Sequence, residues 1–572
     1  CNQLGSIDFT NLSTTGLKYA DAMFFQAGAD GSTADFSGWK IPSLEDGRYM
    51  FYSAGFSTIN MDGTNPAALT TTTGMFFNCK NLTNLGNNNL SDWTLPAATD
   101  VSYMFCNDNL LSAISTGNWS LQSATDISYM FSDCSSLTAL DVSNWGISAA
   151  LKKMDCAFYN CARVSALNMS GWDVSGLSSA FAAFSKMSAL TNANISGWIP
   201  SSLQIANSLF AYDYSLASIN IGSSTAPQLR DAAGMFYNCI SLESVGLKNL
   251  ITASAENLAY IFSGCANVSN LDLSAWNTSN VQYMQCMFDG MASVSKIAFG
   301  NDFSTTSAKS TGAMMRNCSS LGSSSIQSFI ALFNPSQDED AYEMFRGCEK
   351  LANVDFTSKD FTKTANVTRM FYGDDMLSVI TLPSTFMSGV TDVSNNAKNV
   401  FYCNTDSLTY LTIKATALPS WVKSYDWNAD NRYFLLHNDS SINGNSGTSY
   451  KFENAANSPA VLLFDVSSTL YLDNNVPEAV SYKWSNGSTP LSDVMNNISV
   501  AKADVGSYTC TAYFADIANA ESLSDTFTVT KSSGVTGIAA KYTGKSVIVN
   551  NDYNKNEVTV KVTMDDGSSK TL

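Results

Sequence analysis

Apolar and polar residues alternate in short stretches that return at a nearly constant interval along most of the chain. One copy, residues 130–145, reads MFSDCSSLTALDVSNW. Counted from Phe131 as position 0, the apolar residues Leu137, Leu140 and Val142 fall at +6, +9 and +11. Because alternation with a period of two is typical of a half-buried strand, the pattern predicts a strand over +6 to +12. The segment that ends in Met-Phe favours a short helical or 3₁₀ turn.

The residue at position 0 marks fifteen units. It falls at Phe24, Phe51, Phe76, Phe105, Phe131, Phe158, Phe184, Phe210, Phe236, Phe262, Phe288, Met315, Phe345, Phe371 and Phe401. Seven of the fourteen intervals are 26 residues long, and the others range from 25 to 30. One unit of this size cannot bury its apolar face alone, so the units are expected to stack into a continuous solenoid with one parallel strand per unit.

Two further columns recur within the units and are interpreted as core ladders. Position +3 is cysteine in Cys79, Cys134, Cys161, Cys239, Cys265, Cys318 and Cys348. Position +14 is tryptophan in Trp119, Trp145, Trp172, Trp198 and Trp276. Other residues occupy +3 at Met187, Asp213, Met291, Asp374 and Asn404. Cysteines in neighbouring units meet the distance condition for a disulfide, but parallel Cβ vectors do not favour one, so we expect small buried fillers.

The pattern MF-x-x-C-x-x-L-x-x-L-D-L-S-x-W resembles the 26-residue bacterial surface-protein repeat, a relative of the BspA-like leucine-rich repeats. The resemblance covers residues 1–415. It implies a leucine-rich-repeat-like solenoid and an extracellular role in adhesion or ligand binding, because that family occurs in bacterial lipoproteins and in secreted or wall-bound proteins. It implies no particular ligand.

The first residues follow the phase of the repeat. Cys1, Leu4, Ile7 and Phe9 fall at +3, +6, +9 and +11 of a unit whose Met-Phe pair would precede the chain. We therefore expect the chain to start inside a repeat. The alternative is that Cys1 is the acylated cysteine of a mature lipoprotein.

The repeat pattern ends near residue 415. Residues 416–456 are aromatic and irregular, and they are interpreted as a C-terminal cap and linker. Residues 457–532 carry Trp484 and a D-x-G-x-Y-x-C motif ending at Cys510, and they resemble an immunoglobulin-like sandwich. Because its usual cysteine partner is missing, Cys510 is expected to be a free thiol. Residues 533–572 resemble the first part of a second bacterial Ig-like domain, so the chain is expected to stop inside a domain.

Composition and charge exclude several classes of function. The chain has 49 acidic and 31 basic residues, a net charge of −18, and only 14% charged residues in all. Without a basic cluster it is not expected to bind nucleic acid. A single histidine, His437, supplies neither a multi-histidine metal site nor an ordinary catalytic triad, so no metal, cofactor or catalytic residue is predicted. No apolar run has the roughly 18 residues that a membrane helix needs.

Position +10 forms a polar column on the outer face of the predicted sheet. It holds Asp8, Asp141, Asn168, Asn194, Asn220, Asp272 and Asp355. The candidate ligand-binding residues are Asp141, Asn168, Asn194, Asn220 and Asp272, on the surface formed by +8, +10 and +12. The column is either a recognition surface for sugars, cations or basic segments, or a ladder of side chains that satisfy backbone groups at strand ends.

Together these features predict a non-enzymatic extracellular surface protein for adhesion or ligand binding. Its solenoid would be displayed on Ig-like stalk modules, and its partner would be a protein or glycan on another cell or matrix surface. The alternative is a structural component of an extracellular fibre or a phage virion appendage, whose partners are neighbouring subunits of the assembly.

Overall fold

The structure is a computed structural model that describes residues 13–402, except 88, 195–198, 221–225 and 251, together with strands at 6–8 and after residue 402. The chain divides into two compact units, Cys1–Glu349 and Lys350–Leu572. Each unit is described by itself.

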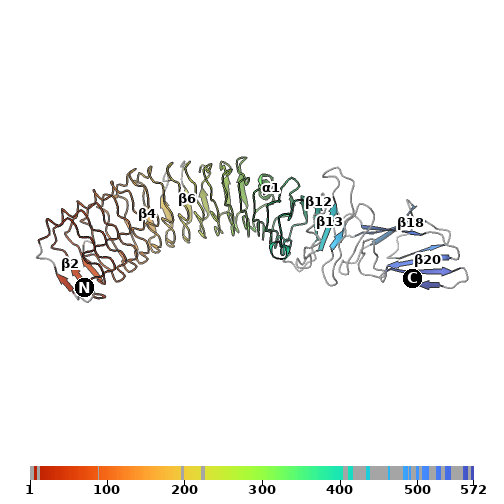
Figure 1. The fold of residues 1–572 in the computed structure, drawn as a ribbon, viewed down its shortest axis with the longest axis horizontal. Coiled ribbons are helices and arrows are strands. Elements are labelled where there is room, and N and C mark those ends of the chain that lie inside the picture. The colour runs from red at the N-terminus through yellow and green to blue at the C-terminus, as the bar shows by residue number, and fades with distance from the viewer. Residues whose placement is uncertain are drawn as a thin grey trace. The chain divides into compact units, whose positions relative to one another are not determined.

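The first unit is a solenoid in which each repeat forms one coil. In Figure 1 these coils lie side by side in chain order, from red through yellow to green. Each coil has a strand side, which carries positions +8 to +11, and a turn side, which carries positions −5 to +3. A coil is named below by its residue at position 0.

Short parallel strands form the strand side. They are β1 Ser6–Asp8, β2 Thr33–Asp35, β3 Thr58–Asn60, β4 Ala166–Asn168, β5 Asn192–Asn194, β6 Ser218–Asn220, β7 Ser244–Gly246, β8 Asn270–Leu273 and β9 Lys296–Phe299. β4 pairs with β5, β6 with β7 and β8 with β9, all in parallel. In β8, buried and exposed residues alternate, as the pattern of period two predicts.

Three coils have neither a strand nor a helix on this side: that of Phe76 has a single bridge, Thr58 to Asn84, and those of Phe105 and Phe131 keep the alternation without a bridge. Residues 110–116 and 137–142 form no strand, so the expectation of one strand per unit is wrong for the coils of Phe105 and Phe131. Leu140 and Val142 are nevertheless buried, and Asp141 between them is exposed. Burial is set by packing against the neighbouring coils and does not require backbone pairing.

The turn side is built differently from the helical turn that the sequence favoured. Phe131 N donates to Ala157 O of the next coil at 2.8 Å, whereas Ser132 N donates to Tyr129 O three residues back. Tyr129 and Asp133, at −2 and +2, have positive φ angles of 59° and 63°. Because alternate residues send their N–H groups to the next coil, the segment is a run of overlapping turns and the expected helical or 3₁₀ turn is wrong.

This arrangement repeats along the whole first unit. Single parallel bridges at position −5 link each coil to the next from Tyr19 to Asp340. Positive φ recurs at +2, where asparagine, aspartate and glycine are frequent, as at Asn78, Asn160 and Gly264. These residue types tolerate the left-handed region best.

The phenylalanine column forms one ladder inside the solenoid. Eleven rings, from Phe24 to Phe288, stack with centroids 5.1–6.2 Å apart and planes within 15° of parallel. Trp119, Trp145 and Trp276 are almost completely buried beside it. The core ladders expected from the repeat are confirmed among the described residues, and Trp198 lies outside them.

One long unit replaces its strand with a helix. The 30-residue interval from Met315 to Phe345 includes α1, Ser323–Leu332. Phe329 of α1 is buried and contacts Phe299 of β9 with ring centroids 5.7 Å apart. The extra residues therefore give a helix that covers the core where a strand is expected.

The second unit contains another parallel sheet. Its strands, in order, are β10 Asn353–Asp355, β11 Val379–Leu382, β12 Tyr410–Ala415, β13 Tyr433–Asn438 and β14 Val461–Leu463. A short helix, α2, spans Val393–Asn396. β13 and β14 lie in the segments assigned from the sequence to the cap and to the first Ig-like module, so parallel pairing extends beyond residue 415. The proposed domain boundaries themselves remain predictions.

Two antiparallel sheets follow. One has the order β16-β15-β18-β19 and the other β17-β20-β21-β22. Their strands are β15 Ser481–Asn486, β16 Thr489–Pro490, β17 Asn497–Ala501, β18 Gly506–Tyr513, β19 Leu523–Val529, β20 Val535–Tyr542, β21 Val558–Met564 and β22 Ser569–Thr571. The register places Trp484 opposite Cys510. The expected free thiol of Cys510 lies outside the described side chains.

Candidate functional site

The predicted polar column is assembled only in part. Asn168, Asn194 and Asn220 are the last residues of β4, β5 and β6, and Asn168 pairs directly with Asn194. In the next coil, Gly246 lies opposite Asn220. A glycine therefore separates Asn220 from Asp272 of β8 in this column. Asp141 lies in a coil without a strand, as described above.

The described members of this column bind their own backbone. Asp141 Oδ1 accepts hydrogen bonds from Ser143 N at 3.0 Å and Ser143 Oγ at 2.6 Å, and these bonds lower the pKa of the Asp141 carboxyl. Asp272 makes the same two bonds with Ser274, which together with Lys248 lower its pKa to about 2. The geometry accounts for the column as a set of local turn caps. Its role in ligand binding stays a prediction.

A second column, on the turn side, was not identified from the sequence. Positions −2 and +1 carry an aromatic ring in most coils of the first unit, at Phe25, Tyr49, Tyr52, Phe77, Tyr103, Tyr129, Tyr159, Tyr237 and Tyr260. We call this surface the ring face. Tyr103 and Tyr129 stack with centroids 4.7 Å apart, and Phe77 contacts Tyr103 at 6.0 Å. The signal was available in the repeat, because tyrosine recurs at these two offsets.

The ring face is interrupted in two consecutive coils. In the coils of Phe184 and Phe210, positions −2 and +1 are Ala182, Ser185, Ser208 and Ala211. Among the coils from Phe24 to Phe262, these two have no aromatic ring at −2 and none at +1. We call this interruption the two-coil gap.

A groove of about 580 Å³ runs across this part of the ring face. It is lined by small residues, among them Cys106, Ser132, Cys156, Ala182, Ser185, Ser208 and Ala211. Its larger lining residues are Phe77, Tyr103, Tyr129, Tyr159, Phe181, Lys186 and Tyr212, and its one carboxylate is Asp133. The volume falls within the range of roughly 300–1,000 Å³ typical of ligand sites.

One cation and one anion lie in the groove. Lys186 Nζ lies 4.9 Å from the ring centroid of Tyr159 and 6.0 Å from that of Tyr212, and its hydrogen bond with Tyr159 raises the pKa of the ammonium. Asp133 Oδ1 accepts from Asn160 Nδ2 at 2.8 Å. Ser132 Oγ, in the lining of the groove, donates to Asp133 Oδ2 at 3.1 Å, so both charges have a partner among the groove side chains.

Beyond the groove, the ring face becomes charged. Arg316 donates to Asp289 at 2.6 Å and to Glu343 at 2.8 Å, and Arg346 donates to Glu343 at 2.7 Å. All four residues occupy positions −2 or +1 of successive coils. Ion pairs thus replace stacked rings at this end of the ring face.

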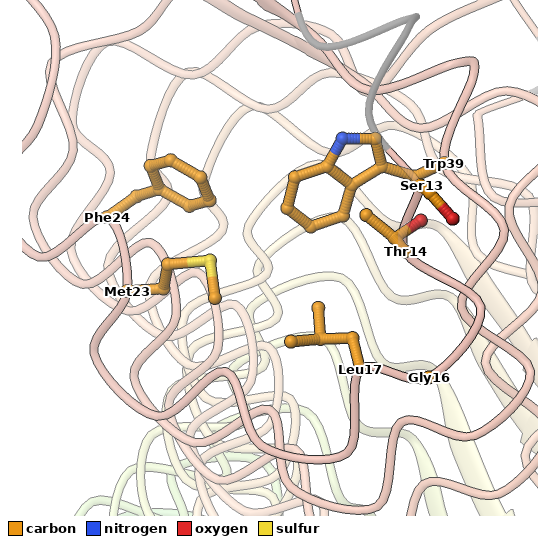
Figure 2. A pocket seen from close by; sticks show the side chains of 7 residues that line it. All are labelled: Ser13, Thr14, Gly16, Leu17, Met23, Phe24 and Trp39. Carbon is orange, nitrogen blue, oxygen red and sulfur yellow. The ribbon is translucent and has the colours of Figure 1, made fainter.

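A second cavity, of about 450 Å³, lies at the first described coil. Figure 2 shows Leu17, Met23, Phe24 and Trp39 arranged around it. Phe24 is the first ring of the core ladder. Its lining begins at Ser13, the first residue of the continuously described part of the chain, so the cavity supports no site.

Position +3 forms a buried column with its own chemistry. Cys134 Sγ donates to Phe105 O of the preceding coil at 3.2 Å, and six other cysteines in this column do the same in their coils. Burial raises the pKa of Cys265 to about 12, so its thiol stays protonated. The seven cysteines of this column are free and buried, as expected from their parallel stacking, and Cys106, Cys156 and Cys286 at other positions are free as well.

Aspartate takes the place of cysteine in this column at Asp108, Asp213 and Asp374. Asp108 Oδ1 accepts from Cys79 N and Asp213 Oδ1 accepts from Met187 N, each at 2.8 Å. Among the described residues neither Oδ2 has a hydrogen-bond partner. Burial raises the pKa of both carboxyls well above the usual value. A protonated Oδ2 would supply the hydrogen-bond donor that the cysteine thiol supplies in the other coils. From the sequence, Asp213 was noted at this position and Asp108 was not.

Other kinds of site find no support in the described part of the chain. No group of three or more histidine, cysteine, aspartate or glutamate side chains is placed to hold a metal there. Within the same residues, no helix has the length and apolar character needed to cross a membrane.

The solenoid of roughly 26-residue coils defines the chain as a repeat protein with parallel strands. The chain belongs to the family DUF285, described as "Mycoplasma protein of unknown function", whose model matches residues 6–87, 70–198, 204–329 and 256–381 in tandem. No curated protein matches the sequence.

Proposed function

We propose that this chain is a non-enzymatic surface protein that acts outside the cell by adhesion or ligand binding. In this proposal the solenoid is a relative of the BspA-like leucine-rich repeats, and the antiparallel sheets after residue 480 are Ig-like stalk modules. Its partner is a protein or glycan on another cell or on a matrix.

The groove of the ring face carries the proposal. An aromatic, largely uncharged groove of about 580 Å³ exposes apolar surface that the fold of the coil does not need. The described residues around it hold one carboxylate, Asp133, which accepts from Ser132 and Asn160, and one ammonium, Lys186, which lies over the ring of Tyr159. Binding without chemistry is the simplest use of such a surface.

The proposal is tested with the whole chain on immobilised cells and extracellular matrix. We compare the wild-type chain with a ring-face variant, Tyr129→Ala with Tyr159→Ala, and with a strand-side variant, Asp141→Ala, Asn168→Ala and Asn194→Ala. Loss of binding in the ring-face variant alone assigns the role to the groove. Loss in the strand-side variant alone assigns it to the polar column.

Absence of binding by the folded wild-type chain would contradict the proposal. Fibres formed by that chain in electron micrographs would then favour the alternative of a structural component.

A further inference from the structure

We propose that the groove of the ring face binds a neutral, unbranched glycan whose sugar rings enter the two-coil gap. The inference rests on the proposed function and adds to it the location and chemical class of the ligand. It follows from three properties of the groove: its aromatic rings, its balanced charge and its fully used backbone.

In both aromatic columns the stacked rings stop at or before the two-coil gap. Tyr129 stacks on Tyr103 on one side, but the next residue in its column is Cys156, which has no ring. Tyr159 is followed in its column by Ser185, and Lys186 Nζ lies over its ring, 4.9 Å from the centroid. A sugar ring has an apolar face of C–H groups, so it can pack against an aromatic face as the missing ring would.

The floor of the gap permits close approach. Ala182, Ser185 and Ala211 are buried and carry at most one heavy atom beyond Cβ. Neighbouring coils lie about 4.8 Å apart, so two coils without a ring at −2 or +1 leave room for rings in succession along the axis, bordered by Phe181, Lys186 and Tyr212 of the same coils. A flat ring can therefore lie where a tyrosine side chain lies in the coils on either side.

The charges in the groove suit hydroxyl groups better than ions. Lys186 and Asp133 cancel each other, and the other polar atoms belong to serine, tyrosine and cysteine side chains. A carboxylate accepts and an ammonium donates, so sugar hydroxyls can bond to both. A polyanion would meet a single cation in a chain of net charge −18.

The backbone of the groove is not available to a peptide strand. Cys156 N donates to Phe181 O, Ala182 N to Asn207 O and Ser208 N to Ala233 O of the next coil. Tyr159 N and Ser185 N donate three residues back, within their own turns. Strand addition needs free main-chain groups, so recognition here depends on side chains.

The test measures binding of three neutral probes, cellohexaose, chitohexaose and maltohexaose, to the whole chain by titration calorimetry. A polyproline decamer is measured in parallel, because proline-rich peptides also bind aromatic grooves. We expect at least one hexasaccharide to bind and Tyr159→Ala to weaken that binding at least tenfold. Tyr260→Ala, on the same face but outside the groove, should leave it unchanged.

A second variant fills the gap without removing any group. Tyrosine is already found at −2 with positive φ at Tyr103 and Tyr129, so Ala182→Tyr should fold and place a ring in the first coil of the two-coil gap. It should abolish hexasaccharide binding while keeping the thermal midpoint. Ala22→Tyr makes the same change at the same offset outside the groove, and it should leave binding intact.

Failure of all three hexasaccharides to bind the folded chain would overturn the glycan assignment. So would binding that survives Ala182→Tyr, or selective binding of the polyproline decamer. If cell or matrix binding still depended on Tyr129 and Tyr159 in that case, the proposed function would stand and only the ligand class would fall.

Discussion

The two sides of each coil are held together in different ways. The strand side pairs in short pieces, such as β4 with β5, and has no strand in the coils of Phe105 and Phe131. The turn side is linked from coil to coil without a break from Tyr19 to Asp340. The difference shows that the continuous backbone scaffold of this solenoid is the turn side, while the strand side depends mainly on packing.

The same difference bears on where a ligand would bind. The strand side exposes polar caps that already bond to their own turns, as Asp141 does with Ser143. The turn side exposes rings and a groove whose lining side chains are not needed for the backbone links. A rigid scaffold that presents spare side chains is the better platform for recognition.

The largest expected effect is on the packing of the strand side. Leu140→Asp should lower the free energy of unfolding by about 4 kcal/mol or more, because a charge without a partner would enter a close-packed core. Chemical denaturation followed by circular dichroism measures the change. Asp141→Ala, one residue away and exposed, is the control; similar losses in both would mean that packing does not hold this side.

A somewhat smaller loss is expected in the core of the turn side. Phe158 stacks between Phe131 and Phe184, with ring centroids 6.2 and 5.7 Å away. Phe158→Ala should cost about 3–4 kcal/mol through lost burial and a cavity. Tyr159→Ala, the next residue but on the outer face, should cost under about 1 kcal/mol. Equal losses would contradict the separation of core ladder and ring face.

The third prediction is a gain in stability, whereas the first two are losses. Asp213 has a folded-state pKa above the unfolded value of about 3.8, so its contribution to stability is complete below that pH and is lost as the pH rises toward the folded pKa. Asp213→Cys restores the thiol of the other coils and should raise the thermal midpoint at pH 7 by a few degrees. Thermal unfolding between pH 4 and 8 measures it.

The control for that experiment is Asp272→Asn. Asp272 is exposed and its pKa is lowered to about 2, so it stabilises the fold above the unfolded pKa and should show the reverse dependence on pH. If Asp213→Cys lowered the thermal midpoint at pH 7, the inference that the Asp213 carboxyl is protonated in the fold would be wrong.

The smallest effect concerns a single cap of the strand side. Asp141→Ala removes two hydrogen bonds from Ser143 and should cost about 0.5–1 kcal/mol. Ser143→Ala removes the hydroxyl and leaves the bond from the backbone, so it should cost less. A loss of several kcal/mol in either would mean that the polar column has a larger structural role.

The sequence predicted the stacked coils and the buried columns because those depend on residue type and spacing. Leu140, Val142 and the Phe24–Phe288 ladder are buried as expected. It did not predict α1, or the parallel strands β13 and β14, since their segments lack the repeat pattern. The turn side was missed because alternating positive φ leaves no simple hydrophobic period.

The candidate site also has features that the sequence shows and features that only the structure shows. Tyrosine at −2 and +1 is visible in the sequence, but two offsets three residues apart do not reveal that Phe77 contacts Tyr103 of the next coil. The column of Asp141 and Asn168 was found because it follows the strand period.

By itself, the sequence determined the repeat, its length and the residues that each coil buries, because apolar side chains at fixed offsets must share one core. Only the tertiary structure decided which side carries the continuous hydrogen bonds and where the ring face is interrupted. Those features arise from contacts between residues about 26 positions apart, whose geometry depends on how one coil lies on the next.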